Sequence, residues 1–256
     1  MKKLFHFVKR RRSRPHKVDT QLSELRQGQL AISCYGQRIG GDGYEFVRVS
    51  PDKVLFALLD VAGRRENNRT IVAAVQETFR SAGTRLLGKE AVNEADAMVE
   101  LCLKLNAIVL KTAHRICACP MFAGCYNEKL STISYFNAGH TPGLLGDPAG
   151  VTELHATGLP LGLFSHSTPD AGIVAVPPGG GLLLVSRGVV EAKRKGEEFG
   201  LERAKESLRR AVSERAADPS AVLLDALQEF TYKSPIRNDV TVLALTRSAR
   251  AKAMAG

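Results

Sequence analysis

The sequence KVLFALLDV, residues 53–61, joins a continuous apolar run to an acid at its end. A short run of this kind, rich in branched and aromatic side chains, predicts a buried strand. Asp60 stands where that strand leaves the core, and a carboxylate next to a buried run costs free energy unless a partner compensates its charge. The stretch therefore predicts a central strand and raises the question of what Asp60 binds.

Two further aspartates adjoin apolar segments. Asp42 lies in IGGDGYEF, residues 39–46, whose three glycines predict a turn or tight bend. Asp239 opens the apolar stretch VTVLAL. Spacing alone leaves two interpretations open: each acid caps a turn, or the three converge on a hard divalent cation. Mg²⁺ or Mn²⁺ would relieve the repulsion between converging carboxylates, because both ions prefer oxygen ligands.

The rest of the chain alternates between helical and extended patterns. Apolar or small residues recur with helical spacing over 66–87 and 94–115, and the Asp218-Pro219 pair predicts the start of a later helix. Because strands come in blocks and helices in pairs, the pattern predicts an α+β fold with mostly antiparallel sheets and helices on their outer faces. The predicted strands cover residues 29–36, 53–61, 121–128, 130–139, 143–146, 151–155, 172–176, 181–186 and 239–246.

The net charge of +10 is concentrated at the two ends of the 256-residue chain. Residues 1–17 hold eight Lys and Arg residues, residues 247–256 hold three, and neither segment holds an acid. These 11 of the 36 basic residues leave 25 against 26 acids, so the body is close to neutral. A globular nucleic-acid reader would carry its charge on the body, so no nucleic-acid partner is expected.

The predicted organisation is one domain over residues 21–247, with a basic, disordered tail at 1–20 and a disordered tail at 248–256. The N-terminal tail is either a solvated end or an electrostatic contact to a membrane surface or an acidic partner. No apolar stretch reaches the roughly 18 residues that a membrane span requires. The expected location is the cytoplasm.

Six segments, taken in order, resemble the SpoIIE/RsbU-type serine phosphatases, a branch of the PPM (protein phosphatase 2C) superfamily. The specificity of the resemblance lies in the order of the segments, which span about residues 29–246. It implies a PPM-type antiparallel β-sandwich flanked by helices, with α/β/β/α layers and a metal centre at one end. The segments are IGGDGYEF, LLDVAGRR, SYFNAGHTPGLL, TGLPLGLF, LLLVSRGVVEA and NDVTVLAL.

The resemblance implies that Asp42, Asp60 and Asp239 are catalytic residues that bind metal, with the backbone carbonyl of Val61 as a further ligand. Asp60 would bridge two ions, and the cofactor would be Mn²⁺ or Mg²⁺, with the second ion in doubt. The implied reaction is hydrolysis of a phosphoserine or phosphothreonine monoester without a covalent phosphoenzyme. The implied partner is a phosphoprotein, such as an anti-sigma antagonist of the STAS type.

The chain departs from the family pattern at Arg187, where Ser-Arg-Gly replaces Ser-Asp-Gly or Thr-Asp-Gly. The missing acid is a metal ligand in that pattern. Unit charges ~4 Å apart interact by roughly 4 kcal/mol at an effective dielectric of ~20, so a cation there weakens metal binding. Arg187 either turns inward and pairs with Asp239 or Asp60, or faces solvent and leaves the acids to bind metal weakly.

Two functions follow from this departure. The first is a metal-dependent protein serine/threonine phosphatase whose activity Arg187 impairs to some degree. The alternative is a pseudophosphatase that binds the phosphoprotein partner without efficient turnover.

Two matched segments contain residues whose role is open. His140 in NAGH is either a general acid or phosphate contact, or a residue hydrogen-bonded inside a turn between strands, and the second interpretation is favoured. Gly158 and Gly162 in TGLPLGL are expected to serve backbone geometry.

Two further positions differ from the family pattern. Glu45 stands where the family usually has a second aspartate. Its carboxylate keeps the charge on a longer side chain, so a supporting role is expected to survive. After Asp60 the family tends to have Lys-Gly with small residues, where this chain has RRENNRT, residues 64–70. Arg64 and Arg65 either contact substrate phosphate or face solvent at a helix start.

Overall fold

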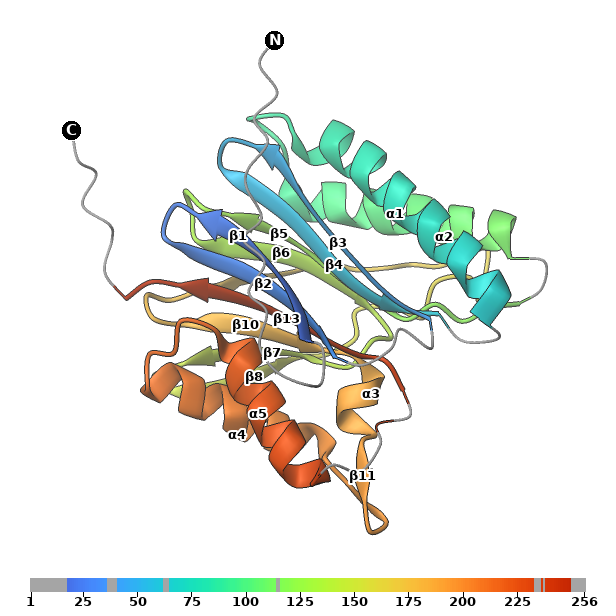
Figure 1. The fold of residues 1–256 in the computed structure, drawn as a ribbon. Helices are drawn as coiled ribbons and strands as arrows, with labels where there is room; N and C mark the ends of the chain where they lie inside the picture. Colours follow the sequence, from blue (N-terminus) through green and yellow to red (C-terminus); the bar gives the residue numbers. More distant parts are fainter. Residues whose placement is uncertain are drawn as a thin grey trace.

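The structure, a computed structural model, describes residues 18–35, 41–61, 65–113, 116–232, 236 and 238–249, with backbone only at 65–67. Two antiparallel sheets lie face to face between two pairs of helices (Figure 1). This α/β/β/α arrangement confirms the predicted α+β fold class. Within the described ranges, no helix is long and apolar enough to span a membrane.

The first sheet has six strands, and the last strand of the chain lies near its centre. Val185, at the end of β10, pairs with Val242 near the start of β13. Because the two strands are antiparallel, Asp239 and the exit of β10 lie at the same end of the sheet. The strand order is β1 (Val18–Leu25), β2 (Gly28–Tyr35), β13 (Val240–Arg247), β10 (Gly181–Val185), β7 (Gly143–Asp147) and β8 (Gly150–Leu154).

The second sheet has five strands, and the stretch of residues 53–60 forms one of them. Every residue of that strand is buried except Asp60, as the apolar run predicts. The edge strand next to it is β3, which begins with Asp42. The strand order is β3 (Asp42–Ser50), β4 (Lys53–Asp60), β5 (Met121–Asn127), β6 (Thr132–Ala138) and β9 (Gly172–Ala175).

Helices cover the outer face of each sheet (Figure 1). The pair α1 (Arg65–Leu87) and α2 (Glu94–Thr112) packs on the second sheet, and α4 (Gly200–Ser213) and α5 (Pro219–Thr231) pack on the first. As predicted, α5 begins after Asp218, whose Oδ1 accepts a 3.0 Å hydrogen bond from the Ser220 N–H. The smaller elements are α3 (Arg187–Val190), β11 (Lys193–Arg194) and β12 (Glu197–Glu198).

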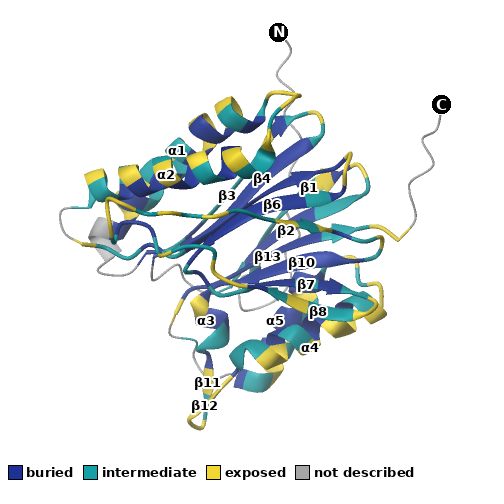
Figure 2. Ribbon diagram, turned by 180° about the vertical axis from the view of Figure 1, so that it is seen from behind, coloured by how far each residue is buried: buried dark blue, intermediate teal, exposed yellow. Residues whose placement is uncertain are grey.

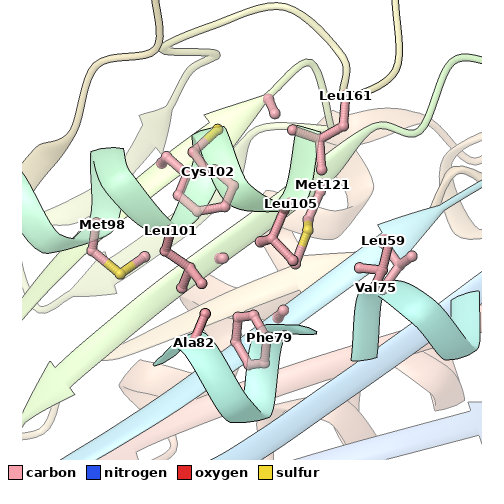
Figure 3. Packing of buried hydrophobic residues seen from close by; sticks show 14 of the residues in the cluster. Leu59, Val75, Phe79, Ala82, Met98, Leu101, Cys102, Leu105, Met121 and Leu161 are labelled. Carbon is pink, nitrogen blue, oxygen red and sulfur yellow. The ribbon is translucent and has the colours of Figure 1, made fainter. Parts of the chain in front are cut away.

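Three apolar clusters join the four layers. Between the sheets, Phe122 stacks on Tyr135 with ring centroids 5.3 Å apart. Between the second sheet and its helices, Phe79 and Leu101 reach toward each other from α1 and α2 (Figure 3). Figure 2 shows the resulting pattern, with buried strands inside and exposed helix faces outside. At about 1.5–3 kcal/mol for each large side chain buried, these clusters rather than the polar end of the sandwich stabilise the fold.

The predicted bend at residues 39–46 is wrong from Asp42 onward, and residues 39 and 40 lie outside the described residues. Asp42 begins β3 and the strand continues through Ser50, paired with β4. Gly43 serves packing instead of a bend, because a Cβ there would lie 2.8 Å from Cγ1 of Val72 on α1.

Five elements were not anticipated from the sequence: β1, β3, α3, β11 and β12. The predicted tail at 1–20 overlaps β1, whose first residue, Val18, pairs with Tyr35. This edge strand is half exposed and mostly polar, so it lacks the apolar pattern of the inner strands. The short helix α3 was also missed. Residues 1–17 and 250–256 of the predicted tails lie outside the described residues.

Candidate functional site

Asp42 and Asp60 are register partners at one end of the second sheet. Asp42 is the first residue of β3 and Asp60 is the last residue of β4. Residues directly opposite in an antiparallel pair have Cα atoms about 4.5–5.5 Å apart and side chains on the same face. The sequence separates these acids by a hairpin, and the sheet brings them together.

The third acid, Asp239, arrives from the opposite sheet. It directly precedes β13, and Thr241 on that strand donates a 2.9 Å hydrogen bond from its hydroxyl to Oδ2 of Asp42. The charge of Asp239 raises the pKa of both Asp42 and Asp60. All three predicted acids therefore lie close enough to repel one another.

The electrostatics of this cluster are most unfavourable at Asp42. Its pKa rises from an ordinary 3.8 to about 7. Burial is the largest cause and the charge of Asp60 is the second, while hydroxyls of Ser186 and Thr241 lower the value. A buried acid that prefers its neutral form beside two other acids marks a place where a positive charge would be stabilising.

Arg187 supplies part of that positive charge. Its Nε lies 3.2 Å from Oδ2 of Asp60 and 3.7 Å from Oε1 of Glu191. Burial raises the pKa of Asp60, Arg187 lowers it, and Glu191 and Asp239 raise it again. The inward pairing with Asp60 is one of the two predicted outcomes, although the Arg187 side chain stays 57% exposed.

The backbone around Arg187 is fixed by β13. Ser186 donates its N–H to the Thr241 carbonyl at 2.9 Å, and its Oγ accepts the Thr241 N–H at 3.0 Å. A Cβ on Gly188 would lie 1.9 Å from the carbonyl oxygen of Asp239, so only glycine fits there. The position of the arginine thus follows from the strand pair and the close approach of α3.

The carbonyl of Val61 is already hydrogen-bonded. It accepts a 2.9 Å hydrogen bond from Nδ2 of Asn68, and the Val61 N–H donates to the carbonyl of Gly41 at 3.0 Å. Asn68 did not stand out in the sequence. The signal that identifies it is its place on the buried stripe of α1, three residues before Ile71.

The residues present fit a cation only in part. Three mutually repelling carboxylates and a carbonyl are the oxygen donors that Mg²⁺ and Mn²⁺ prefer. Arg187 stands in place of a fourth acid, so the set does not fit two ions. Among the described residues, no three His, Cys, Asp or Glu side chains are arranged to hold a metal ion as they stand. A cation would have to compete with the contacts that Asp60 and Val61 now make.

His140 serves the turn in which it lies. Its N–H donates to Oδ1 of Asn137 at 2.8 Å, and its Nδ1 lies 3.0 Å from Oγ1 of Thr141. Burial lowers the pKa of His140 to about 4. These contacts within the turn agree with the turn interpretation.

The two glycines of TGLPLGL differ. Gly162 has φ +81°, and a Cβ there would lie 2.4 Å from the carbonyl of Cys117, so the prediction of a geometric role is confirmed. The prediction is wrong for Gly158, where a Cβ would meet nothing closer than 3.5 Å.

Glu45 and the arginines after Asp60 take no demonstrated part in the cluster. Glu45 pairs with Arg80 on α1 and faces that helix. Arg64 and the side chain of Arg65 lie outside the described residues, so their predicted phosphate contacts stay predictions.

A family model and a curated relative both point to serine phosphatases of the SpoIIE type. A family model described as stage II sporulation protein E (SpoIIE) matches residues 50–248. The phosphoserine phosphatase RsbP of Bacillus subtilis (strain 168) is 25% identical over 167 residues, which cover 64% of this chain and 40% of that protein. The chain therefore spans less than half the length of this relative.

Solved structures show the same fold. The SiaA-PP2C domain of Pseudomonas aeruginosa superposes with a TM-score of 0.66 at 17% identity, covering 81% of this chain and 80% of that one. RsbX, in a crystal structure in complex with magnesium, superposes with a TM-score of 0.64 at 12% identity, covering 90% of this chain and 100% of that one. At these identities the likeness establishes the PPM-type fold.

Proposed function

Because this chain belongs to the SpoIIE family of PP2C-type serine phosphatases, we propose that it acts on a serine-phosphorylated protein and hydrolyses the phosphomonoester slowly. We further propose that the reaction depends on Mn²⁺ or Mg²⁺ and that one domain over residues 21–247, extended by the start of β1, carries it. The reduced rate is attributed to Arg187.

The convergence of Asp42, Asp60 and Asp239 carries this proposal. The two sheets bring these acids from distant parts of the chain to one end of the sandwich. The pKa of Asp42, which burial and the charge of Asp60 raise to about 7, supports a site where a cation would be stabilising. A protein that needed these acids only to cap turns would have no reason to bury them beside one another.

The residues proposed to hold the ion are Asp42, Asp60 and Asp239, with the Val61 carbonyl as a fourth oxygen. When bound, a divalent cation lowers the pKa of a water molecule and offsets charge on the phosphoryl oxygens. The contribution of the chain is orientation: the β3–β4 register sets Asp42 against Asp60, and the Thr241 hydroxyl holds Asp42. Arg187 weakens binding of the ion, because its positive charge already compensates the carboxylate of Asp60.

The proposed partner is a phosphoprotein of the STAS anti-sigma antagonist type. The resemblance to RsbU-type phosphatases and the similarity to RsbP, a phosphoserine phosphatase, support this assignment. We propose a cytoplasmic location, with residues 1–17 available for contact with a membrane surface or an acidic partner through their eight basic residues. The near-neutral body gives no reason to expect a nucleic-acid partner.

A second candidate is a pseudophosphatase that binds the phosphoprotein without efficient turnover. The contact between Arg187 and Asp60 favours it, because a guanidinium takes the place that a metal would need. In this case the fold and the partner surface persist while the chemistry is lost.

Manganese-dependent hydrolysis of an aryl phosphate by wild type and Arg187→Asp separates the two candidates. The slow phosphatase predicts measurable wild-type turnover that EDTA abolishes and that Arg187→Asp raises at least tenfold. The pseudophosphatase predicts no wild-type turnover above background. Arg209→Asp, an exposed arginine on α4, serves as the matched charge control. Absence of turnover in both wild type and Arg187→Asp, despite bound manganese, would reject the phosphatase proposal.

A further inference from the structure

Asn68 and the carbonyl of Val61 form a contact that the proposed function does not explain. We infer that Asn68 is a positioning residue that competes with a cation for this carbonyl, as Arg187 does for the neighbouring carboxylate of Asp60. The inference rests on the proposed function, since it concerns the same acid cluster. It names a second residue of this chain that sets how readily the cluster takes up a divalent ion.

The hydrogen bond is buried and of ordinary length. Asn68 is 3% exposed and Val61 is 2% exposed, so neither group exchanges freely with water. Nδ2 of Asn68 lies 2.9 Å from the Val61 carbonyl oxygen. A cation that bound this oxygen would have to share it with the amide or displace the amide from it. A buried donor left without its acceptor costs an amount that corresponds to about a 5- to 150-fold loss in affinity.

The contact is also held in place by its surroundings. Gly41 accepts the Val61 N–H at 3.0 Å. A Cβ on Gly41 would lie 2.2 Å from the Val61 carbonyl oxygen and 2.8 Å from Nδ2 of Asn68. The three groups therefore lie close together, with no room for a methyl group on Gly41.

Arg187 and Asn68 act on consecutive residues. The guanidinium reaches Asp60 from α3, and the amide reaches Val61 from α1. Both residues thus place a nitrogen donor on an oxygen that the resemblance assigns to the metal. The carbonyl has a second lone pair, so Asn68 weakens a cation site without closing it.

Calorimetric titration with MnCl₂ tests this inference without relying on turnover. We expect Asn68→Ala to bind Mn²⁺ at least fivefold more tightly than wild type, and Asn68→Ala/Arg187→Asp to bind more tightly than either single variant. The melting temperature in Mn²⁺ minus that in EDTA should increase in the same order. Asn106→Ala is the matched control, because Asn106 is a buried asparagine on α2 that holds Gly162 and Phe164 instead.

An Asn68→Ala protein that is folded by circular dichroism and binds Mn²⁺ no more tightly than wild type overturns the inference. If Asn68→Ala does not fold, Asn68→Asp keeps the shape and replaces the donor with an acceptor, and unchanged Mn²⁺ affinity in that variant overturns the inference equally. Tighter Mn²⁺ binding without any phosphatase activity supports the inference and counts against the proposed hydrolysis. Hydrolysis by wild type with unchanged Mn²⁺ affinity in Asn68→Ala supports the hydrolysis and counts against the inference.

Discussion

Asp42 and Asp60 face each other across the end of β3 and β4, so one strand begins with an acid where its neighbour ends with one. Like charges directly opposite in a sheet destabilise it. The fold accepts this cost at one end while its three apolar clusters hold the rest together. An arrangement of side chains that lowers the stability of the fold locally is expected at functional sites.

The first prediction concerns Asp42. Its folded pKa of about 7 lies above its unfolded value near 3.8, so the native state binds the proton more tightly. The unfavourable contribution of the ionised group therefore grows as pH rises from about 4 to about 7. We expect Asp42→Asn, without metal, to raise the free energy of unfolding at pH 8 by about 1–4 kcal/mol.

Urea denaturation in EDTA at pH 8 and pH 4.5 measures this effect. The stabilising difference should shrink toward zero at pH 4.5, where Asp42 is protonated in the native state. A variant that is equally or less stable than wild type at pH 8 would show that the acid cluster is not strained.

The second prediction concerns the glycine before Asp42. Gly41→Ala should lower the free energy of unfolding by roughly 2 kcal/mol or more, because its Cβ would lie 2.2 Å from the carbonyl of Val61. Gly158→Ala is the control, since its Cβ would meet only ordinary contacts at 3.5 Å. Equal urea midpoints for the two variants would contradict the close packing described beside the acids.

The third prediction tests how α2 is joined to the second sheet. Lys53 is 5% exposed, and its ammonium lies 3.5 Å from Oε1 of Glu94, the first residue of α2. Glu94→Ala would leave this buried charge with only backbone carbonyl partners, at a cost of about 2–4 kcal/mol.

The surface pair of Lys104 and Glu100 provides the comparison. Glu100 is 53% exposed, so Glu100→Ala should change the free energy of unfolding by less than about 0.5 kcal/mol. Thermal and urea unfolding of both variants measure the difference. Losses of similar size would mean that the Lys53–Glu94 pair contributes no more than a surface contact.

Much of this fold could be predicted from local pattern. The apolar run ending at Asp60 identified β4, and the Asp218-Pro219 pair identified the start of α5. Both signals are local, because burial of a strand and capping of a helix depend on residues that are neighbours in the sequence. Glycines misled the prediction at Gly43, since a glycine that makes room for a helix looks in sequence like one that makes a bend. Whether Arg187 would meet Asp60 or Asp239 depended on how two sheets stack, which no local pattern contains.

Asn68 shows where a stronger prediction was available. It occupies the buried stripe of α1 with Ile71, Val75 and Phe79. A polar side chain in such a stripe must find a hydrogen-bond partner inside the protein. The pattern therefore indicated a buried contact, but its acceptor, the Val61 carbonyl, could be identified only from coordinates.

Asp42, Asp60 and Asp239 are proposed to form a cation pocket whose edge Arg187 occupies. The most direct measurement is manganese anomalous scattering from crystals of Arg187→Asp and wild type, soaked under identical conditions. We predict a strong anomalous peak bounded by Asp42, Asp60 and Asp239 in the variant, and a weak peak or none in wild type. Manganese absent from this position in both proteins would contradict the claim.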